Sequence, residues 1–433
     1  MKYFLTSNII EDTLVSYGIC SILFDNGISY ELIRNKSHYL IRYDEKDIDE
    51  DEGIGFEEIT EEEAKTWLNG SNNWTCKKKN LDKTNKYFCN NIENLLEDFK
   101  NHNYGKKTKV GSVGNNFNGT TLNFGGTGVS QQSKEEMIVY LSYLGHIKYI
   151  GYNKSLKGSN VDFEYDLLLV PKLKSCITNI KAARNIYIDK EGNTKIYNFW
   201  SNKSNVESEA LGYLSSLINL YQENINYEQV IFMTSLVTAN NNARDIVKKV
   251  KVENYSLELV NLLKTIINFD KTDLDIRQIT AIFVLENSYR NFEKLIKVYA
   301  KKDQMLNIKF GEEIISMFSN KIQEIYNNES VKKLGERLGE MLRENKGYDI
   351  MTQFLNTNNE FQLSNIIPNV ITEYNRYAKM KDKSGKGWFA IDDTQLIDII
   401  NLVDNKKDAV ITSRAIVAYA KVFFTKKDKT QEN

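Results

Sequence analysis

IIEDTLVSYGICSILFDNGISYELIRNKSHYLIRY, residues 9–43, contains two secondary-structure patterns in succession. From Ile9 to Phe24, apolar side chains recur near helical spacing, and Asp25-Asn26-Gly27 ends the pattern. The β-prone runs Ile28–Ile33 and Tyr39–Tyr43 then flank a short polar loop, which predicts a hairpin. A helix followed by an antiparallel hairpin predicts an α+β fold.

The rest of the region 1–254 is predicted to mix short helices with strands. Helices are predicted at Thr60–Leu68, at Ile92–Phe99, and from Ser133 to about His146, where Ser133-Lys134-Glu135-Glu136 matches a capping box. Strands are predicted at Ile147–Tyr152, Asp162–Val170 and Val230–Val237. We therefore expect a mixed α/β region with small sheets.

Helical periodicity dominates from Tyr255 onward, which predicts an all-helical bundle over residues 255–433. The predicted helices span about residues 256–268, 272–301, 311–326, 330–356, 364–380, 392–403 and 406–424. Pro368 is expected in the first turn of the helix 364–380, where its missing N–H has no partner to lose. The boundary near residue 254 fits the chain length, because single cores stop growing beyond roughly 250 residues.

The charges of the chain balance overall but are segregated along it. Lys and Arg number 57 against 58 Asp and Glu, so overall charge does not attract nucleic acid. Acidic residues dominate from Asp44 to Glu63, and lysines dominate from Lys77 to Lys109. Such runs are either solvated faces or local binding surfaces.

Sequence signatures of catalysis, of metal sites and of membrane insertion are absent. The three histidines (His38, His102, His146) lack metal-ligand spacing, and the four cysteines form no CxxC pair. The chain contains no GxSxG and no Walker-type phosphate loop. It also has no apolar run near the roughly 20 residues that span a bilayer, and its start lacks a signal-peptide pattern. We expect a cytoplasmic, non-catalytic protein without cofactor, metal or membrane contact.

The segment Gly105–Gly128 is the first candidate for contact with nucleic acid. It holds seven glycines, four asparagines and three lysines without a sustained period, which predicts a long loop. Glycine backbone lets phosphates approach, lysines contact them, and asparagine amides match base edges. The candidate residues are Lys106, Lys107, Lys109, Asn115, Asn116 and Asn118. A disordered linker, or a nucleotide-binding loop at Gly125–Gly128, remains an alternative.

Other basic clusters extend the predicted DNA-binding surface. The candidates are Lys154 and Lys157 in a polar turn, Lys203 beside Trp200, and Arg376, Lys379, Lys381, Lys383 and Lys386 at a helix end and the following loop. Arg414 and Lys421 are expected on one side of the last helix, opposite its apolar stripe. These residues predict a basic stripe for a nucleic-acid backbone, or a solvated face.

Three segments resemble the large subunit of type I CRISPR surveillance complexes (Cascade), especially the I-B forms: Gly105–Gly128, Lys154–Pro171 and Ile411–Phe424. The resemblance implies a non-catalytic antiviral-defence subunit that recognises the motif adjacent to the target and aids duplex opening. It also implies guide RNA, target DNA, repeated backbone subunits and a helicase-nuclease as partners. The paired CxxC zinc motifs of some relatives are absent, since only Cys76 and Cys89 stand near Trp74.

Two other classes of function remain open on the sequence. One is an enzyme that binds nucleotide through the glycine-rich loop, and the other is a structural interaction protein without nucleic acid. A DNA affinity that falls steeply with rising salt concentration would separate the nucleic-acid-binding hypothesis from both of these alternatives.

Overall fold

The computed structural model has an α+β fold in two compact units, Met1–Val260 and Asn261–Asn433. It describes residues 1–6, 8–48, 53–60, 78–108, 133–149, 156–157, 161–178, 217–218, 227–238, 243–252, 255–266, 274–381 and 393–423. The predicted boundary between residues 254 and 255 falls a few residues before this division.

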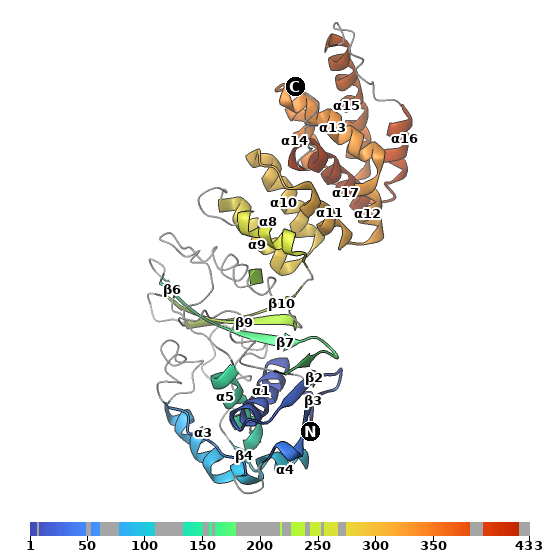
Figure 1. Cartoon of the computed structure of the whole chain (residues 1–433). Coiled ribbons are helices and arrows are strands. Elements are labelled where there is room, and N and C mark those ends of the chain that lie inside the picture. The colour runs from blue at the N-terminus through green and yellow to red at the C-terminus, as the bar shows by residue number, and fades with distance from the viewer. Residues whose placement is uncertain are drawn as a thin grey trace, which may run out of the picture. The chain divides into compact units, whose positions relative to one another are not determined.

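The first unit is built on the crossing of α1 (Ile9–Asp25) with α5 (Glu136–Tyr149) (Figure 1). Asn8 caps α1 through its side chain, and Gly27 follows the helix with a φ of 71°. Nearly all of α1 is buried, including the polar residues Glu11, Asp12, Thr13 and Ser16, so its burial is not limited to one apolar stripe. The predicted helix Ile9–Phe24 is therefore confirmed.

Two antiparallel sheets flank this pair of helices. The predicted hairpin is confirmed as β2 (Tyr30–Arg34) and β3 (His38–Tyr43), which join β1 (Lys2–Phe4) and β8 (Cys176–Ile177) in the order β1-β3-β2-β8. The second sheet has the order β10-β9-β7-β6. Its strands are β6 (Leu156–Lys157), β7 (Val161–Pro171), β9 (Tyr227–Thr238) and β10 (Ala243–Lys251). The Tyr17 hydroxyl of α1 donates to the Leu169 carbonyl of β7 and ties the helix to this sheet.

The strands predicted at Asp162–Val170 and Val230–Val237 are confirmed as β7 and β9. The helix predicted from Ser133 to about His146 is confirmed as α5, but it begins at Glu136, after the short strand β5 (Lys134–Glu135), so Ser133 does not start it. The predicted strand Ile147–Tyr152 is wrong as far as Tyr149, because those residues complete α5. Helix α3 (Lys78–Asn91) was not predicted, since its lysines and asparagines obscure the apolar period. The predicted helix Ile92–Phe99 corresponds to a 3₁₀ turn at Ile92–Asn94 followed by α4 (Leu95–Lys100). Residues 61–68 of the helix predicted at Thr60–Leu68 lie outside the described residues.

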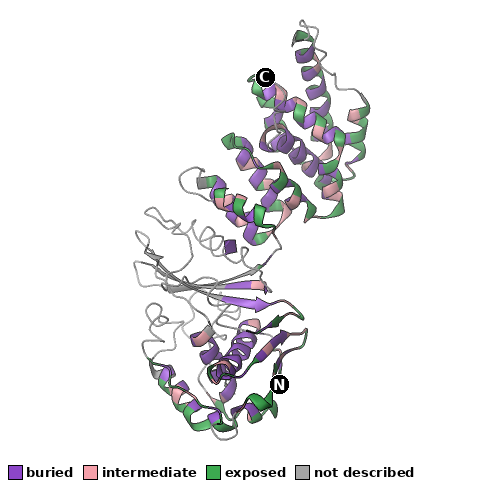
Figure 2. Ribbon diagram, viewed as in Figure 1, coloured by how far each residue is buried: buried purple, intermediate pink, exposed green. Residues whose placement is uncertain are grey.

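The second unit is a helical bundle, as predicted. After α8 (Leu257–Ile266), which crosses the boundary between the units, its helices are α9 (Leu274–Glu286), α10 (Tyr289–Lys302), α11 (Ile308–Ser316), α12 (Asn320–Asn327), α13 (Glu329–Arg343), α14 (Tyr348–Asn356), α15 (Glu360–Lys381), α16 (Asp393–Asn401) and α17 (Lys406–Val417). A π-helical segment, η7 (Ala418–Val422), continues α17. Helix α17 contacts α10, α12, α13, α14 and α15, and it is the buried centre of the bundle (Figure 2).

Three predicted helices are each two helices in the structure, because residues that end or cap a helix interrupt their apolar periods. Asn287 (φ 39°) precedes Ser288, which caps α10 and splits the predicted helix 272–301. The breaks in 311–326 and 330–356 fall before the N-caps Ser319 and Gly347. Helix α15 begins at Glu360, so Pro368 lies in its interior and not in the first turn. There it removes one helical hydrogen bond.

Candidate nucleic-acid interface

The described residues on either side of positions 109–132 pair with each other and form a base for the predicted glycine-rich loop. Strand β4 (Lys107–Thr108) pairs with β5 (Lys134–Glu135), and the intervening residues 109–132 lie outside the described residues. The backbone N–H of Glu136 donates to the Lys106 carbonyl at 2.9 Å, which joins this base to the start of α5. The side chains of Lys106 and Lys107 are exposed, and neither forms an ion pair with another described residue. The base therefore presents two free cations where the loop begins.

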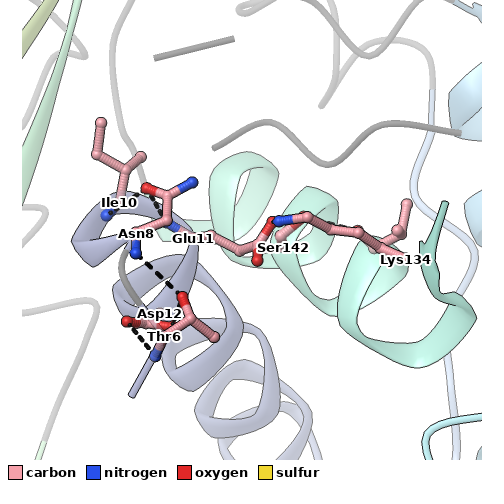
Figure 3. Close-up of polar contacts among 8 residues, drawn as sticks. Thr6, Asn8, Ile10, Glu11, Asp12, Lys134 and Ser142 are labelled. Atoms are coloured by element: carbon pink, nitrogen blue, oxygen red, sulfur yellow. Dashed lines mark hydrogen bonds and ion pairs between the residues drawn. The ribbon is translucent and has the colours of Figure 1, made fainter. Parts of the chain in front are cut away.

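An ion pair links Lys134, six residues after the predicted loop, to α1. Lys134 Nζ contacts Glu11 Oε2 in the first turn of α1 (Figure 3). The Glu11 side chain is 2% exposed and the Lys134 side chain 18%. Breaking such a pair leaves a buried charge without compensation, so this contact fixes the position of Lys134 and its strand against α1.

The neighbouring carboxyl group, Asp12, holds the chain just before α1. Its oxygens accept from the Thr6 backbone N–H at 2.9 and 3.1 Å and from the Thr6 hydroxyl at 2.8 Å (Figure 3). Burial raises the pKa of Asp12 to about 6, against the opposing effect of the Thr6 hydrogen bonds. The carboxyl group therefore gains or loses its proton near pH 6.

The stability of the first unit is expected to carry a pH dependence from Asp12. A carboxyl whose folded pKa exceeds its unfolded value of about 3.9 binds more protons in the folded state between the two values. Stability then falls as pH rises from about 4 to about 6, by up to about 3 kcal/mol. Unfolding of Asp12→Asn and the unchanged protein by urea at pH 4, 5, 6 and 7 measures this. The variant should gain relative stability across that window, whereas parallel curves would contradict the assignment.

Most of the other predicted site residues fall outside the described part of the chain. These are Lys109, Asn115, Asn116, Asn118, Lys154, Lys203, Lys383 and Lys386. The nucleotide-loop alternative at Gly125–Gly128 lies there as well. Lys157 belongs to β6, and Lys381 is the last residue of α15. The described residues therefore leave most of the predicted DNA contacts untested.

Arg376 and Lys379 are exposed near the end of α15, but Arg376 has both cations and carboxylates as neighbours. It borders a shallow groove of about 380 Å³ together with Lys346, Asp349 and Glu373. Lys346 lies over the ring of Tyr377, with its Nζ 5.2 Å from the ring centroid. Two cations and two carboxylates at one rim make this groove mixed in charge, not a purely basic surface.

Arg414 contradicts the prediction of a solvent-facing basic stripe on the last helix. It is 1% exposed, and its Nε donates to Glu293 Oε1 at 3.0 Å. Its terminal nitrogens donate to the carbonyls of Phe354 and, at 3.4 Å, Thr357. The prediction was wrong because α17 is surrounded by other helices, so the side opposite the apolar stripe is also buried.

The prediction that Lys421 faces solvent in a basic stripe is also wrong. Its side chain is 13% exposed, and Nζ lies 3.3 Å from Asp303 Oδ1. The same Nζ lies 5.2 Å from the centroid of the Tyr348 ring. An ammonium occupied by a carboxylate and an aromatic face has a structural role in the bundle.

Helix α10 carries a row of basic side chains that was not predicted as a binding surface. Arg290, Lys294, Lys297 and Lys301 are spaced i, i+4, i+7 and i+11, which places them on one face of the helix. The segment YRNFEKLIKVYAKK contains this signal, because its cations recur at helical spacing between the apolar residues of the buried side.

Comparison with known proteins assigns no family, since no family model and no curated protein matches the chain. Within the described residues, no helix has the length and apolar character needed to cross a membrane. The same residues contain no group of three or more His, Cys, Asp and Glu side chains arranged for a metal ion. Cys76, one of the two cysteines near Trp74, lies outside the described part of the chain, and Cys89 is exposed.

Proposed function

We propose that the chain is a non-catalytic subunit that binds nucleic acid through the glycine-rich segment 105–128. The supporting observation is the base of that segment, where the exposed Lys106 and Lys107 lack ion-pair partners among the described residues. The β4–β5 pairing and the Lys134–Glu11 ion pair hold the described residues on either side of positions 109–132 against the first unit. A fixed base reduces the conformational freedom lost when a loop closes on a ligand.

The more specific proposal is a type I CRISPR surveillance complex. In it the chain would be the large subunit that recognises the motif adjacent to the target, with guide RNA, target DNA, repeated backbone subunits and a helicase-nuclease as partners in the cytoplasm. The support is the sequence resemblance at Gly105–Gly128 and Lys154–Pro171. The third segment, Ile411–Phe424, lends no basic surface, because its described residues are mainly the buried centre of the bundle.

The salt dependence of DNA binding tests the proposal at the loop. Replacing Lys106, Lys107 and Lys109 with glutamine should reduce the slope of log affinity against log salt by about 0.9 per lost duplex phosphate contact. The measurement is fluorescence anisotropy of a labelled 30-base-pair duplex with the full chain between 50 and 200 mM salt.

The matched control carries the same charge change elsewhere in the first unit. Lys36, Lys46 and Lys86 are exposed and lie outside this segment, so their replacement with glutamine should leave the slope nearly unchanged. Equal slopes for the two triple variants would reject the loop as the binding site. Purification of the chain with its native partners tests the assembly, because the CRISPR proposal requires a short RNA and a repeated backbone protein in the same complex.

A further inference from the structure

Helix α10 presents four cations in one row on the second unit. Arg290, Lys294, Lys297 and Lys301 lie within about 60° of helical arc, given 100° per residue, and extend over about 16 Å. Arg290, Lys294 and Lys301 are exposed. The row is therefore a straight, accessible line of positive charge.

The carboxylates around α10 are already engaged with other groups. Glu293 contacts both Lys297 (3.1 Å) and the buried Arg414 (3.0 Å). Asp275 pairs with Lys302 at 2.8 Å, and Asp303 pairs with Lys421 at 3.3 Å. Arg290, Lys294 and Lys301 consequently form no ion pair with any described residue.

The opposite face of α10 fixes the direction in which the row points. Phe292, Leu295, Ile296 and Tyr299 are buried, and the helix packs against α9, α17 and η7. Such packing holds the cations at constant spacing on a rigid element, so a ligand that matches the row loses little free energy in ordering the protein. A row of this kind suits a ligand with regularly repeated negative charge.

We propose that the outer face of α10 binds the sugar-phosphate backbone of a nucleic acid, at a site separate from the glycine-rich segment. One strand of a duplex carries a phosphate about every 3.4 Å of helix axis, so 16 Å of α10 faces about five phosphates. Contacts between these cations and phosphate oxygens carry no sequence information, so binding at the row is expected to be independent of base sequence. The choice of a nucleic acid as the ligand rests on the proposed function. The residues of this site are different from those of the glycine-rich segment.

The test removes the three unpaired cations from the full chain. Arg290→Gln, Lys294→Gln and Lys301→Gln together should reduce the salt slope by about 2.7 for a labelled duplex and about 2.1 for a labelled single strand, if all three contact phosphates. Lys297 is kept because it pairs with Glu293. The control variant replaces Lys264, Lys309 and Lys333, on α8, α11 and α13, with glutamine and carries the same charge change. Circular dichroism and thermal unfolding verify that both variants fold.

Each result distinguishes this site from the loop. A reduced slope in the α10 variant alone supports the proposal, whichever nucleic acid gives the larger change. Slopes equal to those of the control overturn it, even where the Lys106, Lys107 and Lys109 variant still weakens binding and so upholds the loop. Polyglutamate serves as an acidic-protein probe, and loss of its binding with unchanged DNA affinity also overturns the proposal.

Discussion

Replacing Arg414 with methionine is expected to lower the free energy of unfolding of the C-terminal unit by about 3–5 kcal/mol, the usual cost of removing one partner of a buried ion pair. Arg414 joins three parts of the bundle, since its guanidinium bonds Glu293 of α10 and the carbonyls of Phe354 and Thr357 at the end of α14. Methionine fills similar space but satisfies none of these acceptors. For a unit of this size, the loss corresponds to a fall in Tm of about 6 to 20 °C.

Differential scanning calorimetry of the full chain provides the measurement, and two further variants identify the cause. Arg414→Lys retains charge but has one nitrogen in place of a planar fork, so most of the loss should remain. Adding Glu293→Gln to Arg414→Met should restore part of the stability. Glutamine is uncharged, so the double variant no longer holds the Glu293 carboxylate without the guanidinium of Arg414. A Tm for Arg414→Met within 1 °C of the unchanged protein would show that the contacts of Arg414 contribute nothing to stability.

Arg414 also shows where reasoning from sequence fails. In ITSRAIVAYAKVFF the apolar residues recur with helical spacing, and an arginine opposite them is usually solvated. The inference assumes that a helix has one buried face. Helix α17 is instead buried all round, and its charge is neutralised by Glu293, 121 residues earlier in the sequence. No local pattern contains a pairing over that separation.

The elements that sequence did predict are those with strong local periods. Helix α1, the β2–β3 hairpin, β7 and β9 each carry a strong local pattern of apolar residues, and the structure confirms them. Strand β10 was missed because its lysines interrupt the alternation, and it is defined by pairing with β9. Composition alone identified the lysines at the base of the glycine-rich segment as candidates. Their tether, Lys134–Glu11, depends on a contact between residues 123 positions apart.

Replacing Gly145 with alanine is expected to destabilise the first unit by about 3 kcal/mol, at the upper end of the usual cost of overpacking. A Cβ at Gly145 of α5 would lie 1.9 Å from the Leu14 carbonyl oxygen of α1. At the same crossing, a Cβ at Gly18 of α1 would lie 2.2 Å from the Leu141 carbonyl oxygen of α5. Both obstacles are backbone atoms, so no change of rotamer relieves the clash and the helices must separate. The gain of about 1 kcal/mol in helix propensity from glycine to alanine offsets only part of this cost.

Urea unfolding of Gly145→Ala, Gly18→Ala and Gly55→Ala separates the close approach from the general effect of the added methyl group. Gly55 is exposed, and the nearest atom to its added Cβ is Asn26 Oδ1 at 3.7 Å, so its replacement should change stability by less than about 0.5 kcal/mol. The two buried variants should each lose far more, and their effects should be less than additive, because one separation of the helices relieves both clashes. Stability of Gly145→Ala equal to that of Gly55→Ala would mean that α1 and α5 do not cross at these glycines. In that case the base of the glycine-rich segment, which is joined to both helices, would also be positioned differently.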